Sequence, residues 1–305
     1  MIEALKLIQF RAAYNLPVHA GMAAGIFAGH GLAIEIAYTP GSLFLSQALK
    51  DGRFDIGHTG ADDVVADVES DSRSDLFIFM GLHGGLFSLI GAPKFPSVQS
   101  LFDQTIGVDA AGSGFVLALE NFLRAQGLAK NAYRLSEIGG WESRCRALLE
   151  GTVAATLLTE PFIDTALRAG CHLLARDFEI APDYQGTCGA ASRSWAMRNS
   201  QQLIRYLRAY SEATCWCFAR ENRNACLDLL TRHHEMDRAT ADLTLNALLD
   251  PAHGLYPKAA VNLSGVAAVV ELRADLGYLP RPVPPLEKYV DLAYYRNAVE
   301  RPGPL

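Results

Sequence analysis

Two histidines follow short apolar runs and could carry protons. His58 comes directly after Ile56-Gly57, and His83 comes after a run that ends at Gly81. An imidazole changes its charge near neutral pH and is the most frequent general acid or base in enzymes. His58 and His83 are therefore the candidate proton carriers if the chain is an enzyme. The alternative is a loop histidine that bonds only to the backbone.

A larger set of residues at the ends of predicted strands could bind a small anion. Arginine can hold a carboxylate or sulfonate through two hydrogen bonds, and a helix that opens with serine or glycine leaves backbone amides for an anion. Each residue also has a purely structural interpretation, such as a surface arginine, a helix cap or a turn. The best single candidate for a ligand oxyanion is Gly112-Ser113-Gly114. The candidates are Arg11, Tyr14, Asn15, Ser42, Thr59, Gly84, Ser113, Gly114, Trp141 and Glu160.

Motifs for metal ions and phosphate cofactors are missing from the sequence. His233 and His234 are adjacent and would point apart on a helix, and neither H-x-x-x-H nor C-x-x-C occurs. Gly112-Ser113-Gly114 lacks the G-K-[ST] ending of a phosphate loop, and no G-x-S-x-G nucleophile elbow is present. We therefore expect no metal and no cofactor.

Alternating strands and helices are expected to position these residues. From Leu5 to about Leu89 the pattern is strand, helix, strand, helix, strand, helix, strand, and a second α/β unit starts at Thr105. Apolar strands that alternate with helices predict sheets covered on both faces. Because ligands of open α/β sheets sit beyond the carboxyl ends of the strands, the candidates are expected to share a cleft.

Prolines and a return of the chain divide the sequence into two predicted lobes. Pro93 and Pro96 break regular structure and predict a crossover to a second lobe, and the chain is expected to return near Thr187. We predict a first lobe from residues 1–90 and 191–305 and a second lobe from residues 91–190, with the ligand cleft between them.

Composition excludes several classes of partner. A length of 305 residues suggests about two domains, and a net charge of −6 without a long lysine or arginine block disfavours nucleic acid. No apolar run reaches the roughly 18–20 residues that a membrane helix needs, so we expect no membrane insertion. The six cysteines lack metal or redox spacing and are expected to be reduced, mostly buried thiols.

Several stretches resemble the type II periplasmic-binding-protein-like family, in the branch of sulfonate, taurine and nitrate binding proteins and thiamine-pyrimidine precursor proteins. The resemblance implies two lobes, each with a mixed, mostly parallel sheet flanked by helices, and a ligand clamped between them. It is specific for the fold and not for the ligand. The stretches are Ala24-Gly25-Ile26-Phe27, Gly31-Leu32, Gly52-Arg53-Phe54-Asp55-Ile56-Gly57, Ser97-Val98-Gln99-Ser100-Leu101 and Thr105-Ile106-Gly107-Val108.

Two enzymes on this fold give partial matches. Gly140-Trp141-Glu142-Ser143-Arg144 resembles a stretch of a biphenyl-sulfinate desulfinase, but Asn15 stands where that enzyme has its cysteine, and Leu43 lies near its histidine position. The pyrimidine synthases use a lysine for pyridoxal phosphate, and the matching position falls near His58. Their cysteine-rich metal motif is reduced here to Cys188. Neither activity is expected by those mechanisms.

The sequence therefore predicts binding of a small organic anion, a carboxylate or sulfonate that can be aromatic. The alternative is a cofactor-independent lyase, a decarboxylase or desulfinase-like enzyme, with His58 or His83 as the proton carrier. A predicted strand begins a few residues after Met1 without a recognisable export signal, which favours a cytoplasmic location. A periplasmic location and a transporter permease partner are expected only if an export signal was removed.

Overall fold

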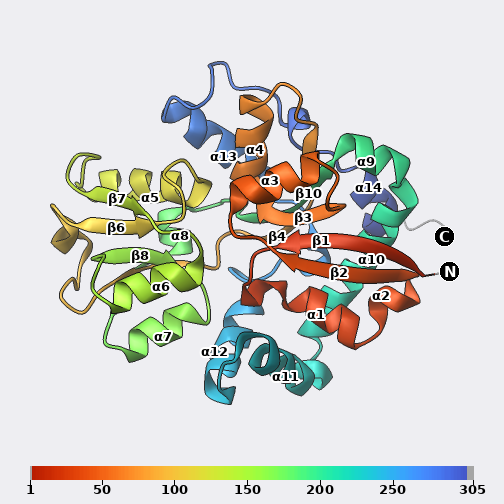
Figure 1. The fold of residues 1–305 in the computed structure, drawn as a ribbon, viewed down its shortest axis with the longest axis horizontal. Coiled ribbons are helices and arrows are strands. Elements are labelled where there is room, and N and C mark those ends of the chain that lie inside the picture. The colour runs from red at the N-terminus through yellow and green to blue at the C-terminus, as the bar shows by residue number, and fades with distance from the viewer. Residues whose placement is uncertain (1, 301–305) are drawn as a thin grey trace.

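The computed structural model describes residues 2–300, which form two lobes that lie side by side (Figure 1). Each lobe is built on one five-stranded sheet with helices around it. None of the helices in this described part is long and apolar enough to cross a membrane.

The sheet of lobe one has the strand order β2-β1-β3-β10-β4. Strand β1 pairs in parallel with β2 and β3, whereas β10 pairs antiparallel with β3 and β4. Every residue of β4 is buried, as expected for an apolar run between two covered faces. The strands are β1 (Glu3–Gln9), β2 (Leu32–Tyr38), β3 (Ile56–Gly60), β4 (Leu76–His83) and β10 (Thr187–Ser192).

The sheet of lobe two has the strand order β7-β6-β8-β5-β9. Strand β6 pairs in parallel with β7 and β8, and β5 pairs antiparallel with β8 and β9. The α/β class with two mixed sheets is therefore confirmed. The antiparallel pairs come from β5 and β10, the strands by which the chain enters one lobe and returns to the other. The strands are β5 (Ser88–Gly91), β6 (Thr105–Val108), β7 (Arg134–Glu137), β8 (Ala155–Leu158) and β9 (His172–Arg176).

The chain changes sheets between His83 and Ser88 and again between Arg176 and Thr187. The bounds of the two lobes, residues 1–90 plus 191–305 and residues 91–190, remain a prediction. Here, lobe one means the elements around the first sheet, and lobe two means β5 to β9 with the helices that lie between β5 and β10 in the chain.

Helices cover both faces of the lobe-one sheet. Neighbouring β1 residues point to opposite faces, so Leu7 packs with α1, α2 and α10, while Ile8 packs with α3, α4 and α13. The helices of lobe one are α1 (Leu16–Ala23), α2 (Ile26–Gly29), α3 (Ser42–Lys50), α4 (Ala61–Ser70), α9 (Arg193–Arg198), α10 (Ser200–Phe218), α11 (Arg223–His234), α12 (Arg238–Leu248), α13 (Leu263–Asp275) and α14 (Ala293–Tyr295). The helices of lobe two are α5 (Gly114–Ala125), α6 (Trp141–Leu149), α7 (Phe162–Arg168) and α8 (Asp177–Ile180).

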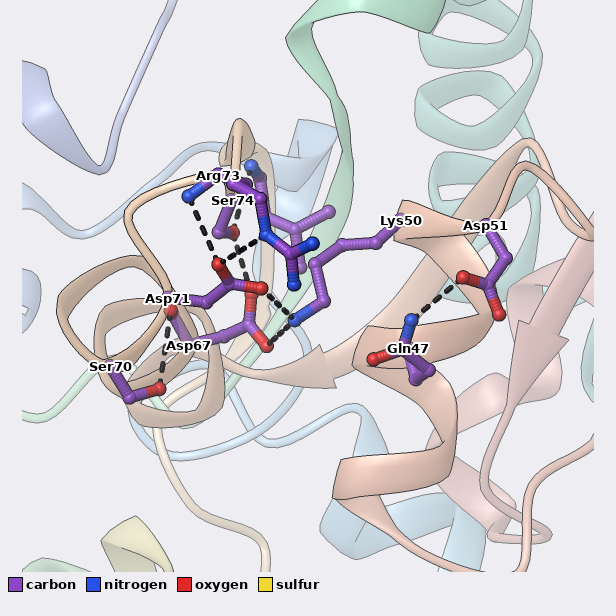
Figure 2. Close-up of polar contacts among 9 residues, drawn as sticks. Gln47, Lys50, Asp51, Asp67, Ser70, Asp71, Arg73 and Ser74 are labelled. Atoms are coloured by element: carbon purple, nitrogen blue, oxygen red, sulfur yellow. Dashed lines mark hydrogen bonds and ion pairs between the residues drawn. The ribbon is translucent and has the colours of Figure 1, made fainter.

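A cluster of charged residues joins the carboxyl-terminal ends of α3 and α4 (Figure 2). Lys50, the last residue of α3, donates from Nζ to Asp67 at 2.8 Å and to Asp71 at 3.3 Å. The second carboxylate oxygen of Asp67 accepts the hydroxyl of Ser74, and Arg73 bonds to Asp71. Because the lysine ammonium and Asp67 are largely shielded from water, this cluster fixes the two helices to each other more firmly than an exposed ion pair would.

Candidate functional site

A cavity of about 400 Å³ lies between the two lobes. Lobe one contributes the loop after β1, the first turns of α3 and α4, and the segment before β10. Lobe two contributes the loops after β6 and β7 and the first turns of α5 and α6. The lining residues used below are Phe10, Tyr14, Ser42, Leu43, Phe44, Asp62, Asp63, Asp109, Ser113, Gly114, Phe115, Glu137, Trp141, Arg144, Tyr184 and Thr187.

Three helices begin at this cavity without a side-chain cap. The first residues of α3, α5 and α6 are Ser42, Gly114 and Trp141, and within residues 2–300 none of these helices has a side-chain hydrogen bond from its N-cap residue. The first amides of a helix have no partner within it, and the helix dipole gives that end a partial positive charge. Three such ends around one cavity therefore favour a negatively charged group inside it.

Arg144 supplies a full positive charge to the same cavity. Its side chain is buried, Nη1 donates to the carbonyl of Leu157 at 3.0 Å, and the guanidinium carbon lies 4.2 Å from the ring centre of Trp141. The buried Nε has no hydrogen-bond partner in the described part of the chain. Burial lowers the pKa of this guanidinium, although the charge of Asp109 raises it, and arginine stays charged in proteins. Arg144 is thus a positive group with an unused donor.

Two adjacent carboxylates at the start of α4 differ in their partners. Asp62 accepts two hydrogen bonds from Nη1 of Arg273 on α13, at 2.8 and 2.7 Å, and both side chains are buried. Asp63 accepts the hydroxyl of Thr59 at 2.9 Å and the amide of Gly60 at 3.1 Å. Burial, followed by the adjacent charge of Asp62, raises the pKa of Asp63 to about 7. Asp62 is therefore neutralised inside the protein, whereas Asp63 is not.

The lobes approach each other closely at Gly114. A Cβ atom placed on Gly114 would lie 2.2 Å from Cβ of Asp62 and 2.7 Å from the hydroxyl of Tyr184. Only a residue without a side chain permits this distance between the first turns of α5 and α4. Tyr14 adds a link across the cavity: burial raises the pKa of its hydroxyl, and side-chain hydrogen bonds with Thr187 and Trp141 lower it in part.

Five of the predicted ligand-binding residues line the cavity, and five do not. Of the latter, Thr59 only orients Asp63, and the guanidinium of Arg11 lies over the ring of Tyr38 at 5.2 Å. Gly84 packs against the backbone carbonyl of Tyr184. Glu160 lines a second cavity of about 330 Å³. The residues at the inter-lobe cavity are Tyr14, Ser42, Ser113, Gly114 and Trp141.

The predicted proton carriers do not line the cavity. His58 lies inside β3 and is fully buried, with Nδ1 at 3.0 Å from Oδ1 of Asn15 and Nε2 at 2.8 Å from the hydroxyl of Tyr206. The amide nitrogen of Asn15 donates to the carbonyl of Phe10, so its oxygen faces His58 and Nδ1 must carry the proton. His83 is also fully buried, beside the ring of Tyr14.

Because His58 is buried, we expect the stability of the protein to depend on pH. Burial lowers the pKa of His58 to about 3, below the value near 6.5 in an unfolded chain, so the unfolded state binds the proton first. His58 thus stabilises the fold above pH 6.5, and this contribution is lost as the pH falls toward 3. Between pH 6.5 and 4.5 we expect the unfolding free energy of His58→Gln to fall less steeply with decreasing pH than that of the wild type. The expected difference between the two slopes is about 1.4 kcal/mol per pH unit. Urea denaturation at several pH values measures both slopes, and equal slopes would contradict the assignment.

Several cavity residues are not among the sequence-based candidates, and those that matter most for the charge and hydrogen bonding of the cavity are Arg144, Asp63, Asp109 and Tyr184. The spacing of Trp141 and Arg144, three residues apart on one helix, places both side chains on the same face and could have indicated the arginine. Aspartates at the start of a helix are favoured by the helix dipole, which accounts for Asp63 at the first turn of α4 but not for its place in a cavity.

Comparisons with known proteins agree on the fold. The NMT1-like family matches residues 96–231. A search of curated proteins gave no match. The alkanesulfonate-binding protein of Xanthomonas axonopodis pv. citri bound to MOPS is 18% identical, with 95% of this chain and 98% of that chain covered and a TM-score of 0.79.

Two further structures show the same likeness. The periplasmic aliphatic sulphonate binding protein of Escherichia coli is 19% identical, with 98% and 99% of the two chains covered and a TM-score of 0.74. The periplasmic nitrate-binding protein of Synechocystis PCC 6803 is 13% identical, with 98% and 89% covered and a TM-score of 0.80. The chain therefore has the type II periplasmic-binding-protein fold, and its residues 96–231 carry the match to the NMT1-like family.

Proposed function

We propose that this protein binds a small organic anion, a carboxylate or a sulfonate, in the cavity between its lobes. The observation that carries the proposal is the convergence of three uncapped helix ends on one cavity that also contains Arg144. A buried arginine with a free Nε donor is costly unless a ligand uses it, because an unpaired buried donor loses its hydrogen bonds to water.

Aromatic side chains favour an organic body over a bare inorganic ion. Rings line the cavity from both lobes, and an aromatic wall gives a planar or apolar ligand a large contact area. A volume of about 400 Å³ suits a molecule of the size of a substituted benzene or a small alkanesulfonate. The rings belong to Phe10, Tyr14, Phe44, Phe115, Trp141 and Tyr184.

The solved structures with a similar fold support a small organic anion as the ligand and suggest a partner protein. One structure of this fold holds the organic sulfonate MOPS, and another is the ligand-binding component of an ABC-type import system from Staphylococcus aureus, 16% identical with a TM-score of 0.80. We propose that this protein likewise passes its ligand to a transporter permease. Neighbours described as periplasmic favour the periplasmic location over the cytoplasmic one expected from the sequence. A lyase activity is not proposed, since neither His58 nor His83 lines the cavity.

A panel of anions tests the proposal directly. Benzoate, benzenesulfonate, phenylacetate and short alkanesulfonates are each added to the protein during thermal unfolding, beside uncharged amides of the same shape. A ligand at one hundred times its Kd stabilises the folded state by about 2.7 kcal/mol, which raises Tm by several degrees. At least one anion is expected to raise Tm while its amide does not. A panel without any shift at millimolar concentration contradicts the proposal.

A further inference from the structure

We infer that the ligand also carries a positively charged nitrogen, which binds between the carboxylate of Asp63 and the hydroxyl of Tyr184. The ligand would then be a zwitterion that spans the cavity, with its anionic group at Arg144 in lobe two and its cationic group at lobe one. This inference rests on the proposed function and narrows its ligand class.

The charges around the cavity do not fit a purely anionic ligand. Four carboxylates line it, on Asp62, Asp63, Asp109 and Glu137, against the single cation Arg144. Asp62 is neutralised by Arg273. Asp109 accepts the Ser113 hydroxyl at 2.7 Å, and no described lysine, arginine or histidine forms an ion pair with Asp109 or with Asp63. Arg144 already interacts with the charge of Asp109, which raises the pKa of its guanidinium, so a bare anion would add more negative charge than this one cation balances. A cationic group on the ligand removes that cost.

The position of Asp63 makes it the receptor of that group. Its carboxylate lies at the first turn of α4 in lobe one, whereas Arg144 lies one turn into α6 in lobe two. The partners of Asp63 are hydrogen-bond donors without a charge, from Thr59 and from the Gly60 amide. They hold the carboxylate in place and leave its charge uncompensated. A ligand that bridges Asp63 and Arg144 also contacts both lobes, so it favours the arrangement in which they are close.

Tyr184 gives a second, independent sign of a polar ligand group. Tyr184 lines the cavity and is only 5% exposed, and its buried hydroxyl has no hydrogen-bond partner in the described structure. The hydroxyl lies beside the first turn of α5, near the start of α4. A phenol oxygen that lacks a partner can accept an N–H from a ligand. The carboxylate and the phenol together provide two acceptors for one ammonium group.

Two isosteric probes test the inference. Isothermal titration calorimetry compares 4-(aminomethyl)benzoate, a zwitterion, with 4-(hydroxymethyl)benzoate, an anion of the same shape. We expect the zwitterion to bind wild-type protein at least tenfold more tightly. In Asp63→Asn this preference is expected to disappear, through loss of affinity for the zwitterion only. Binding of the zwitterion near pH 7 is also expected to release protons, because a cation next to Asp63 lowers the pKa of about 7 found without ligand.

The control is Asp67→Asn, the same substitution one turn further along α4. Asp67 lies outside the cavity and binds Lys50, so this variant can lose stability but is expected to keep the preference for the zwitterion. Equal binding of both probes by the wild type overturns the inference and leaves the anion proposal standing. If neither probe nor any anion of the thermal panel binds at millimolar concentration, both proposals fail. The comparison within wild-type protein decides the matter even if Asp63→Asn does not fold.

Discussion

Gly114→Ala is expected to weaken ligand binding by more than tenfold while both lobes stay folded. The added methyl group would lie 2.2 Å from Cβ of Asp62, far below an ordinary contact distance. Asp62 cannot move aside, because Arg273 holds its carboxylate through two hydrogen bonds in a buried position. The backbone of Gly114 is helical and its φ is not positive, so alanine fits the helix itself. The strain therefore falls on the approach of the two lobes.

Small-angle X-ray scattering and calorimetry measure this effect together. We expect a larger radius of gyration for Gly114→Ala than for the wild type in the presence of the best anion from the panel, and a weaker affinity for it. Gly112→Ala is the matched control, because a Cβ atom at that exposed position meets no atom within 4 Å. Wild-type affinity and dimensions in Gly114→Ala would show that the contact between α4 and α5 does not govern binding.

Replacing Arg144 by methionine is expected to abolish most of the affinity for anions. Methionine has a similar length and can keep contact with Trp141, but it removes the charge and the free Nε donor. A hydrogen bond from a charged group in a buried site contributes about 2–3 kcal/mol, which corresponds to a loss of roughly 30- to 150-fold in Kd. This loss should be larger for a carboxylate than for its uncharged amide.

The charge dependence separates binding from packing. Arg144 also donates to the carbonyl of Leu157, so a purely structural role would weaken the carboxylate and the amide equally. Arg146→Met is the control, since Arg146 lies two residues further along α6 on its exposed side. Calorimetric titration of both variants with the carboxylate and with the amide gives the four dissociation constants that this comparison requires. An unchanged carboxylate affinity in Arg144→Met would remove the main support for an anion site.

Sequence patterns predicted the fold, and half of the ten ligand-binding residues proposed from them line the cavity. The apolar run of β4 and the alternation of strands and helices indicated two covered sheets, and this class is confirmed. Ser42, Ser113, Gly114 and Trp141 lie at the cavity because parallel strands send their following loops to one edge of a sheet.

The sequence-based prediction differs from the observed cavity lining mainly because of features of the fold that the sequence does not show. The returning strand β10 lies between β3 and β4, so the loop with Gly84 is kept away from the cavity and the segment before β10 takes its place. Strand β3 continues to Gly60, so His58 and Thr59 point to opposite faces, toward Tyr206 and toward Asp63. Arg144 lies within a helix and not in a loop after a strand, so its spacing from Trp141 is the sequence feature that could have indicated its place at the cavity.

The cluster of Lys50, Asp67 and Asp71 has a consequence for how the specificity of such a protein can diverge. It joins α3 and α4 at the ends remote from the cavity, while Ser42 and Asp63 occupy the ends that line the cavity. Substitutions in the first turns can therefore change ligand preference without loosening the two helices from each other. Natural variation or laboratory selection can explore new ligands at those turns while the remote cluster preserves the scaffold.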